Sequence, residues 1–356
     1  MKNDAVKVLV VDDSVVARQF LRGILSQAGG MDVATVPDAV VALEHIARDR
    51  PDIVVLDLEM PRMHGLDFLR KVMAERPLPV VVCSGHVGGG TDLAMKALEE
   101  GAVGVVAKPR QGGRESIEET AVTLVDAVRA AASAKLKRLP RAKTKLATPV
   151  AGPVSAGTWG TIVAIGASTG GTDALGAVLE RLPAESPAIA MVLHMPEKFT
   201  TAFAARLNRS SAITVKEATD GDRLVPGTAL LAPGGRHLIV RRKGPDFVAR
   251  VIEGPLVSRH RPSVDVLFHS VARAAGGSSV GVLLTGMGED GAAGLAEMKQ
   301  AGAATIAQDE ATSVVFGMAR EAISRGAVDD VVPIEEIAGV VVRRAVEKSG
   351  LSAVRK

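Results

Sequence analysis

The sequence predicts an α/β protein of two domains, each built on a parallel sheet. Short apolar runs alternate with segments of helical spacing in residues 7–109, and the alternation starts again at residue 161. Between these halves, residues 135–160 lose the periodicity and become rich in Lys, Arg, Pro, Thr, Ala and Gly. A length of 356 residues also suggests about two hydrophobic cores. We expect one domain in residues 1–125, a helix end and flexible basic linker in 126–159, and a second domain in 160–350.

Composition excludes several classes of protein. Hydrophobic residues make up 47% of the chain, but no apolar run approaches the roughly 20 residues of a membrane span. The N-terminus leads straight into a strand without a signal-peptide pattern, so we expect a cytoplasmic protein with no membrane insertion. The single cysteine, Cys83, excludes an internal disulfide and a multi-cysteine zinc site. Aromatic residues are only 2%, with no tyrosine, which argues against a nucleic-acid partner.

The first half reads as alternating strands and helices. Apolar runs predict strands at residues 8–11, 52–56, 80–83 and 103–106, and helical spacing predicts helices at residues 14–28, 37–48, 66–74 and 91–100. Such alternation implies parallel strands joined by right-handed crossovers. Functional residues should then lie in the loops after the carboxyl ends of the strands.

Five polar residues follow these predicted strands. They are Asp12, Asp13, Asp57, Ser84 and Lys108. Three carboxylates at one sheet edge repel one another unless a hard cation neutralises them, and oxygen ligands suit Mg²⁺. Such a site would hold a phosphoryl group, which Asp57 attacks while Mg²⁺ and Lys108 balance its oxygens. Any one of these aspartates is more simply explained as a helix cap or turn former, but all five in this order favour the site.

These residues resemble a response-regulator receiver domain, with Asp57 preceding Leu58-Glu-Met-Pro61 and Lys108 preceding Pro109. The resemblance implies a five-stranded parallel (βα)5 sheet of flavodoxin-like type. It also implies that Asp57 takes phosphate from a histidine kinase and that Ser84 is the switch hydroxyl. Mg²⁺ would be held by Asp12, Asp13, Asp57 and the backbone carbonyl of Glu59.

Two residues depart from the receiver pattern. Val105 stands where receivers generally carry an aromatic residue, so the aromatic part of the switch is not expected to operate as usual. His64 stands where an acid is common, which we interpret as a surface change. Phosphorylation itself is still expected.

A strand-to-helix turn organises the second half. The apolar run 162–165 stops at Gly166-Ala-Ser168-Thr-Gly170, which matches the G-x-S-x-G pattern of a nucleophile elbow. Small residues beside the serine allow a sharp turn that exposes its hydroxyl near a helix N-terminus. The alternatives are a glycine-rich turn with a helix-capping serine and a loop that cradles phosphate.

His194 and Asp290 complete a candidate triad with Ser168. Each follows an apolar run, at residues 188–193 and 279–284. On parallel strands, all three would lie at one sheet edge, where a serine needs a base and the base needs a carboxylate. Nearby glycines at 286, 288 and 291 would let backbone N–H groups approach a developing oxyanion. The competing bases are the other histidines of this half, which lie in a hairpin strand, a polar loop and a helix: His237, His260 and His269.

Several motifs of this half resemble the catalytic domain of the chemotaxis protein-glutamate methylesterases. They are Gly166-Ala-Ser-Thr-Gly-Gly171, His194-Met-Pro196, Ala232-Pro-Gly-Gly-Arg-His237, Arg261-Pro-Ser-Val-Asp-Val-Leu-Phe268 and Thr285-Gly-Met-Gly-Glu-Asp-Gly291. The resemblance implies a doubly wound, mostly parallel sheet with an added β-hairpin in residues 225–253. It gives Ser168 the role of nucleophile, His194 that of base and Asp290 that of its orienter. Thr169 and the region of Met287 would line the oxyanion site.

The same resemblance implies a phosphorylation-activated hydrolase of glutamate γ-methyl esters. Its substrates would be the cytoplasmic helices of chemoreceptors, with methanol as product, deamidation of certain glutamines as a second activity, and no cofactor for ester hydrolysis. In the unphosphorylated chain, the receiver would cover the Ser168 edge. Two other functions stay open: a receiver-controlled module that binds nucleotide or phosphate without hydrolysis, and a DNA-binding regulator, which lacks a helix-turn-helix pattern here. The basic linker has a second interpretation as a patch for an acidic partner or membrane surface.

Overall fold

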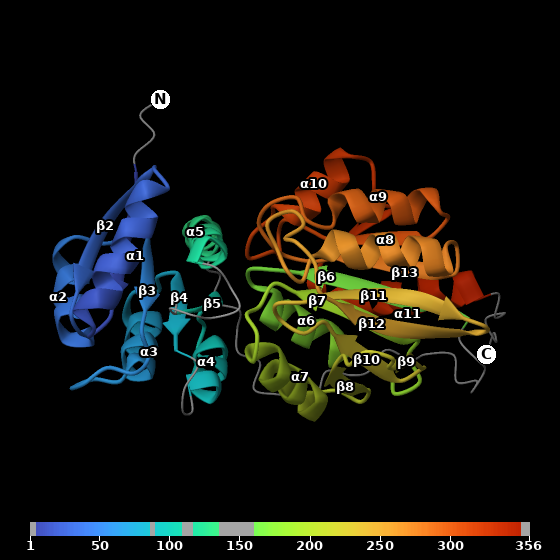
Figure 1. Cartoon of the computed structure of the whole chain (residues 1–356), viewed down its shortest axis with the longest axis horizontal. Coiled ribbons are helices and arrows are strands. Elements are labelled where there is room, and N and C mark those ends of the chain that lie inside the picture. Colours follow the sequence, from blue (N-terminus) through green and yellow to red (C-terminus); the bar gives the residue numbers. More distant parts are fainter. Residues whose placement is uncertain (1–4, 86–89, 109–116, 135–159, 350–356) are drawn as a thin grey trace. The chain divides into compact units, whose positions relative to one another are not determined.

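The computed structural model describes residues 5–85, 90–108, 117–134 and 160–349. The chain divides into two compact units between Leu136 and Lys137, and each is described here by itself (Figure 1). Most of the predicted linker, residues 135–159, and Pro109 lie outside the described residues. Within the described part of the chain, no helix is long and apolar enough to cross a membrane.

The first unit is a parallel five-stranded sheet in the order β2-β1-β3-β4-β5, which confirms the fold expected of it. Helices α1 and α5 contact each other, and so do α2, α3 and α4 in turn, which gives a helical layer on each side. The elements in order are β1 (Val6–Val11), α1 (Val15–Gln27), β2 (Met31–Val36), α2 (Ala39–Arg48), β3 (Ile53–Leu56), α3 (Gly65–Glu75), β4 (Val80–Ser84), α4 (Gly90–Glu99), β5 (Gly104–Ala107) and α5 (Ile117–Ala132).

Strand β2 is the element that the apolar runs did not indicate. It lies at the edge of the sheet and pairs only with β1 among the described strands. Of its six residues, only Val33 and Val36 are buried. A half-exposed edge strand tolerates polar residues, so it lacks the continuous apolar run of the central strands.

The second unit is a seven-stranded sheet in the order β15-β14-β13-β6-β7-β10-β8. Every described pair in it is parallel. Its elements are β6 (Ile162–Ala167), α6 (Gly171–Leu179), β7 (Ala188–Leu193), α7 (Phe199–Ser210), β8 (Thr214–Glu217), β10 (Thr228–Leu231), α8 (Val264–Ala275), β13 (Ser279–Leu283), α9 (Ala292–Gln300), β14 (Ala304–Gln308), α10 (Met318–Ser324), β15 (Asp330–Val332) and α11 (Ile334–Ser349). Helices α8, α9 and α10 form one contacting group and α6, α7 and α11 another (Figure 1).

The added β-hairpin is present, but it is shorter than residues 225–253. It consists of β11 (His237–Lys243) and β12 (Asp246–Ile252), which pair antiparallel, and β9 (Arg223–Leu224) joins β12 to make a separate three-stranded sheet. The first part of the expected range instead forms β10, which lies in the main sheet between β7 and β8. The last three residues of β10, Ala229, Leu230 and Leu231, are fully buried, as an interior parallel strand requires.

Chain order reverses next to β6. From β6 the chain runs through β7 toward one edge of the sheet, and it later returns to β13 on the other side of β6. Strands β6, β7 and β13 are buried along their whole length. In open α/β sheets, a reversal of this kind leaves a crevice beyond the carboxyl ends of the strands, where ligands bind.

Candidate active site and phosphorylation site

The three candidate triad residues follow three adjacent strands. Ser168 follows β6, His194 follows β7, and Asp290 lies in the loop between β13 and α9. The sheet order places β6 between β13 and β7, and the registers pair Gly166 with both Val192 and Leu283. The carboxyl ends of these strands are therefore level, at the point where chain order reverses.

The structure brings these side chains into one hydrogen-bonded chain. His194 Nδ1 lies 3.1 Å from Ser168 Oγ, and His194 Nε2 lies 2.8 Å from Asp290 Oδ2. Because a carboxylate only accepts, the ring proton belongs on Nε2, which leaves the lone pair of Nδ1 facing the Ser168 hydroxyl. This is the arrangement that a general base for Ser168 needs.

Asp290 sits at the N-terminus of α8 and accepts four hydrogen bonds. Its Oδ1 accepts from Ser263 Oγ at 2.7 Å and from the Asp265 N–H at 3.0 Å. Its Oδ2 accepts from the Val264 N–H at 2.7 Å as well as from His194. Burial alone would raise the pKa of this carboxyl, but the hydrogen bonds from His194, Asp265 and Ser263 lower it to about 2. Asp290 is therefore an anion at any pH near neutral.

Two glycines shape the turn that carries Ser168. Gly170 caps α6 with φ +76°, a left-handed conformation that glycine adopts without strain. A Cβ on Gly166 would lie 2.2 Å from Val264 Cγ1, so the absence of a side chain lets α8 approach β6. The Ser168 N–H donates to the Thr285 carbonyl at 3.0 Å, which ties the turn to the β13 loop.

Thr169 and Met287 both lie beside Ser168 in this loop cluster. Thr285 Oγ1 donates to the Thr169 carbonyl at 3.0 Å, and Met287 is 36% exposed next to Gly286. A Cβ on Gly286 would lie 2.8 Å from Ser168 Cβ. Among the hydrogen bonds of the described residues, neither Thr169 nor Met287 uses its backbone N–H. Their role at the oxyanion stays a prediction.

Two of the three competing histidines, His237 and His269, are engaged elsewhere. His237 is buried, donates from Nε2 to the Pro255 carbonyl and accepts the Ser263 N–H at Nδ1. Burial lowers its pKa. His269 lies on α8 and pairs with Glu297. His260 is the exception in position, because its ring stacks on that of His194 with centroids 3.6 Å apart.

The sequence did not single out His260 as part of the site. It lies in the middle of the loop between β12 and α8, well past the end of the strand, so strand-end reasoning does not reach it. The sequence does hold one indication of its place. His260 comes three residues before Ser263, and Ser263 caps the helix whose N-terminus binds Asp290.

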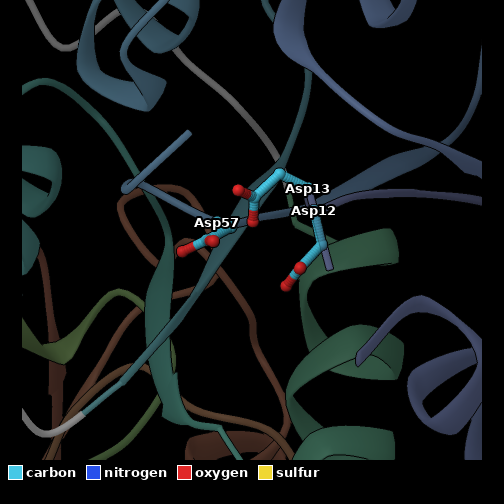
Figure 2. A group of neighbouring side chains, drawn as sticks. All are labelled: Asp12, Asp13 and Asp57. Atoms are coloured by element: carbon cyan, nitrogen blue, oxygen red, sulfur yellow. The ribbon is translucent and has the colours of Figure 1, made fainter. Parts of the chain in front are cut away.

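Three aspartates of the first unit, Asp12, Asp13 and Asp57, also come together (Figure 2). Asp12 and Asp13 follow β1 and Asp57 follows β3, and one carboxylate oxygen of each lies within 4.8 Å of the others. Lys108 Nζ lies 2.7 Å from both Asp12 Oδ2 and Asp57 Oδ2. Burial raises the pKa of the Asp57 carboxyl, although Lys108 acts in the opposite direction.

This donor set fits a hard divalent cation. All three groups are carboxylates, and Asp12 and Asp57 are buried while Asp13 is exposed. Buried carboxylates that lack enough neighbouring positive charge hold their negative charge at a cost, which a bound cation removes. Mg²⁺ is a cation of this kind, and its binding here stays a prediction.

The remaining residues of the first site surround Asp57. The Glu59 N–H donates to Asp57 Oδ1 at 3.3 Å, and Ser84 is buried at the end of β4 with its hydroxyl donating to the Gly85 carbonyl. A Cβ on Gly65 would lie 2.5 Å from the Asp57 carbonyl oxygen, so the start of α3 packs directly against the loop that follows β3. Val105 is buried in β5, and His64 is exposed before α3.

Comparison with known proteins follows the same division of the chain. The family model for CheB methylesterase matches residues 163–341, and that for the response regulator receiver domain matches residues 8–118. The protein-glutamate methylesterase/protein-glutamine glutaminase 1 of Anaeromyxobacter dehalogenans is 55% identical over 95% of this chain and 98% of its own length. The protein-glutamate methylesterase/protein-glutamine glutaminase 2 of Xanthomonas axonopodis pv. citri is 53% identical over 94% of this chain and 99% of its own length.

A solved structure agrees with this assignment for the second unit. The crystal structure of the Thermotoga maritima CheB methylesterase catalytic domain is 37% identical, with a TM-score of 0.51, and the match covers 51% of this chain and 97% of that one. Together with the relatives that are similar over nearly the whole length, these matches show that the chain belongs to the CheB methylesterase family and carries a response regulator receiver domain before its methylesterase domain.

Proposed function

We propose that this chain is a phosphorylation-activated protein-glutamate methylesterase and protein-glutamine glutaminase of bacterial chemotaxis. The observation that carries the proposal is the contact of His194 with both Ser168 Oγ and Asp290 Oδ2. The names of relatives at 53–55% identity support the reaction and its two substrates. We assign the receiver to residues 1–125, the linker to 126–159 and the methylesterase domain to 160–350.

Ester hydrolysis proceeds through an acyl-enzyme on Ser168. His194 Nδ1 takes the hydroxyl proton as Ser168 Oγ attacks the γ-ester carbonyl, and the resulting imidazolium is stabilised by Asp290 through Nε2. His194 then gives the proton to the departing methoxide, which leaves as methanol. Water attacks the acyl-enzyme in the same way and releases glutamate. Deamidation differs only in that the leaving group departs as ammonia.

The tetrahedral intermediate needs donors for its oxyanion. The backbone N–H groups of Thr169 and Met287 belong to the two loops that meet at Ser168, and we assign them this task. Preorganised donors of this kind typically contribute about 10²–10³-fold to kcat. The negative charge held on Asp290 balances the cation on His194 and leaves the oxyanion to these amides.

In the receiver, Asp57 is the phosphate acceptor from a histidine kinase. Asp12, Asp13, Asp57 and the Glu59 carbonyl would hold Mg²⁺, which when bound supplies positive charge to the phosphoryl oxygens. Lys108 adds a further cation at 2.7 Å from Asp57. Ser84 offers its hydroxyl to the phosphoryl group once the Gly85 contact is released. Methylated glutamates on the cytoplasmic helices of chemoreceptors are the proposed substrates, so the protein would act in the cytoplasm.

The esterase assignment is tested by methanol release from methylated chemoreceptor. Ser168→Ala should abolish release and also labelling by a fluorophosphonate probe, whereas Ser324→Ala, an exposed serine at the end of α10, should change neither. Labelling that persists in Ser168→Ala, or a wild-type chain that neither releases methanol nor is labelled, would contradict the proposal. The latter result would favour a module that binds phosphate or nucleotide instead.

Activation is tested with a small phosphodonor such as acetyl phosphate. The donor should raise methanol release by the wild-type chain and incorporate phosphate only when Mg²⁺ is present. Asp57→Asn should lose both effects. Asp67→Asn, which makes the same chemical change at an exposed position of α3, should keep both. Equal stimulation of Asp57→Asn and the wild type would contradict the role of Asp57.

A further inference from the structure

We propose that His260 is a positioning residue for the triad: its ring, stacked face to face on His194, holds the imidazole in the plane that joins Ser168 to Asp290. The inference rests on the proposed function and extends it to a residue outside the triad. The two ring centroids are 3.6 Å apart and the ring planes differ by 15°. This distance is close contact over the whole face of each ring.

A restraint on the face of His194 has a clear physical purpose. The triad contacts hold the two ring nitrogens, Nδ1 through Ser168 and Nε2 through Asp290. The torsion that swings an imidazole about its Cβ–Cγ bond is soft, with broad minima. When Ser168 loses its proton and attacks, the Nδ1 contact changes, and Asp290 alone is left to hold the ring by one edge. A flat group packed on the ring face blocks that rotation throughout the reaction.

His260 is itself held in an unusual turn. The Val257 N–H donates to the His260 carbonyl at 3.1 Å, and the His260 N–H donates to the Val257 carbonyl at 2.9 Å. The two residues between them, Ser258 and Arg259, have φ +49° and +70°. Residues other than glycine adopt this region only at a cost in free energy, and they persist there only where their surroundings impose it. The turn thus accepts local strain in order to present His260 to His194.

The turn is anchored to the same helix that binds Asp290. Ser258 Oγ lies 3.2 Å from Asp265 Oδ2 and donates to it. The backbone N–H of Asp265 donates to Asp290 Oδ1. The side-chain Oδ1 of Asp265 accepts the Gly294 N–H at 2.7 Å. Asp265 therefore connects Asp290, at the edge of the His194 ring, with the turn that places His260 on the face of that ring.

His260 is suited to this task because it stays uncharged. Burial, together with the nearby charge of His194, lowers its pKa to about 3. A neutral aromatic face next to the imidazolium that forms on His194 is compatible with its positive charge, whereas a second cation there would repel it. The stacked geometry also explains why His260 does not act as the base: the contact with Ser168 Oγ belongs to His194.

The test compares a flat ring with ringless side chains at residue 260 in the full-length chain. His260→Phe keeps a planar aromatic ring, and His260→Leu fills a similar volume without one. We expect His260→Leu to lose about tenfold in kcat for methanol release with KM unchanged, a fraction of the roughly 10²–10⁴-fold that general base catalysis contributes. His260→Phe should stay within about threefold of wild type. The rate of Ser168 labelling by a fluorophosphonate should follow kcat in both variants.

Folding is checked by thermal melting, and His260→Gln provides a second ringless variant if His260→Leu melts early. Equal kcat values in the Phe and ringless variants, or a loss confined to KM, would overturn the inference. A purely structural role would lower the melting temperature and the labelled fraction without separating Phe from Leu in rate per labelled site. A wild-type chain without esterase activity would instead refute the proposed function, so the two failures are distinguishable.

Discussion

Replacing Asp290 by Asn tests both the chemistry and the stability that we attribute to the α8 N-terminus. In the wild type, each carboxylate oxygen accepts two hydrogen bonds, and the Val264 and Asp265 N–H donors lie on opposite oxygens. An amide offers one oxygen and one NH2 group. Either orientation therefore sets NH2 against a buried backbone N–H that has no other acceptor, which costs about 1–3 kcal/mol.

The effect on stability can be estimated in a second way. The pKa of Asp290 falls from 3.8 to about 2 on folding, and each unit corresponds to about 1.4 kcal/mol, so its ionisation contributes about 2 kcal/mol. The two estimates describe the same contacts and are not additive. For a domain of this size, about 2 kcal/mol lowers the melting temperature by about 4–8 °C.

The effect on rate follows from the tautomer of His194. In the Asp290→Asn variant, the new side-chain amide donates to Nε2, so the ring proton moves to Nδ1 and faces Ser168. The nitrogen that should accept the hydroxyl proton is then occupied. By analogy with the corresponding change in serine proteases, kcat should fall by about 10⁴-fold. The measurements are methanol release and calorimetric melting of the full chain, with Glu289→Gln, the same change at an exposed neighbour, as the control.

The difference in melting temperature should also depend on pH. Because the folded pKa of Asp290 is depressed, its stabilisation is fully present above the unfolded value of 3.8 and is lost as pH falls through about 2. The difference in melting temperature between wild type and Asp290→Asn should therefore stay constant from pH 7 to about pH 5 and narrow as the pH falls below about 4. A variant that keeps kcat within tenfold of wild type, or a melting gap independent of pH, would refute this reasoning.

Three further changes follow from the structure. Gly166→Ala puts a Cβ 2.2 Å from Val264 Cγ1, so it should destabilise the second unit by about 1–3 kcal/mol in thermal melting. Gly176→Ala, whose Cβ would have its nearest neighbour at 4.0 Å, should cause no such loss, and equal melting temperatures of the two variants would contradict this. Lys108→Met removes the cation that lies 2.7 Å from the buried carboxylates of Asp12 and Asp57. Mg²⁺ should therefore raise the melting temperature of the first unit more in this variant than in the wild type, and a smaller rise would count against the Mg²⁺ site. Ser263→Ala removes the α8 cap and one donor to the triad carboxylate, so it should cost about 0.5–2 kcal/mol and move acid unfolding to higher pH, and unchanged acid stability would argue against that donor.

The proximity of Ser168, His194 and Asp290 could be predicted from sequence because each position is set by the strand just before it. Ser168, His194 and Asp290 each follow an apolar run, and buried parallel strands must appear as such runs when both faces of a sheet are covered. Placing three strand ends at one edge then needed only the assumption that the strands are parallel. The same reasoning predicted that Asp12, Asp57 and Lys108 of the first unit lie close together.

Other features depend on contacts between segments that sequence periodicity does not connect. The edge strand β2 has too few buried residues to be recognised. The backbone donors to Asp290 come from the start of α8, some 25 positions away in sequence. This end of α8 can pack close to β6 only because Gly166 has no side chain. His260 reaches His194 through a turn with positive φ at Ser258 and Arg259, residue types that give no sign of that conformation.

The pKa values of the buried carboxyls of Asp57 and Asp290 are shifted in opposite directions, and the difference matches the proposed roles of the two residues. Asp290 receives more hydrogen bonds than its burial requires, so its pKa is depressed and its charge is held firmly as a partner for His194. Burial raises the pKa of the Asp57 carboxyl, and the nearby Lys108 does not fully offset that effect. An under-compensated carboxylate keeps affinity for a cation and reactivity toward a phosphoryl group, whereas a fully compensated one is inert. The surroundings of the two aspartates therefore fit the roles that we propose for them, a nucleophile at Asp57 and a fixed counter-charge at Asp290.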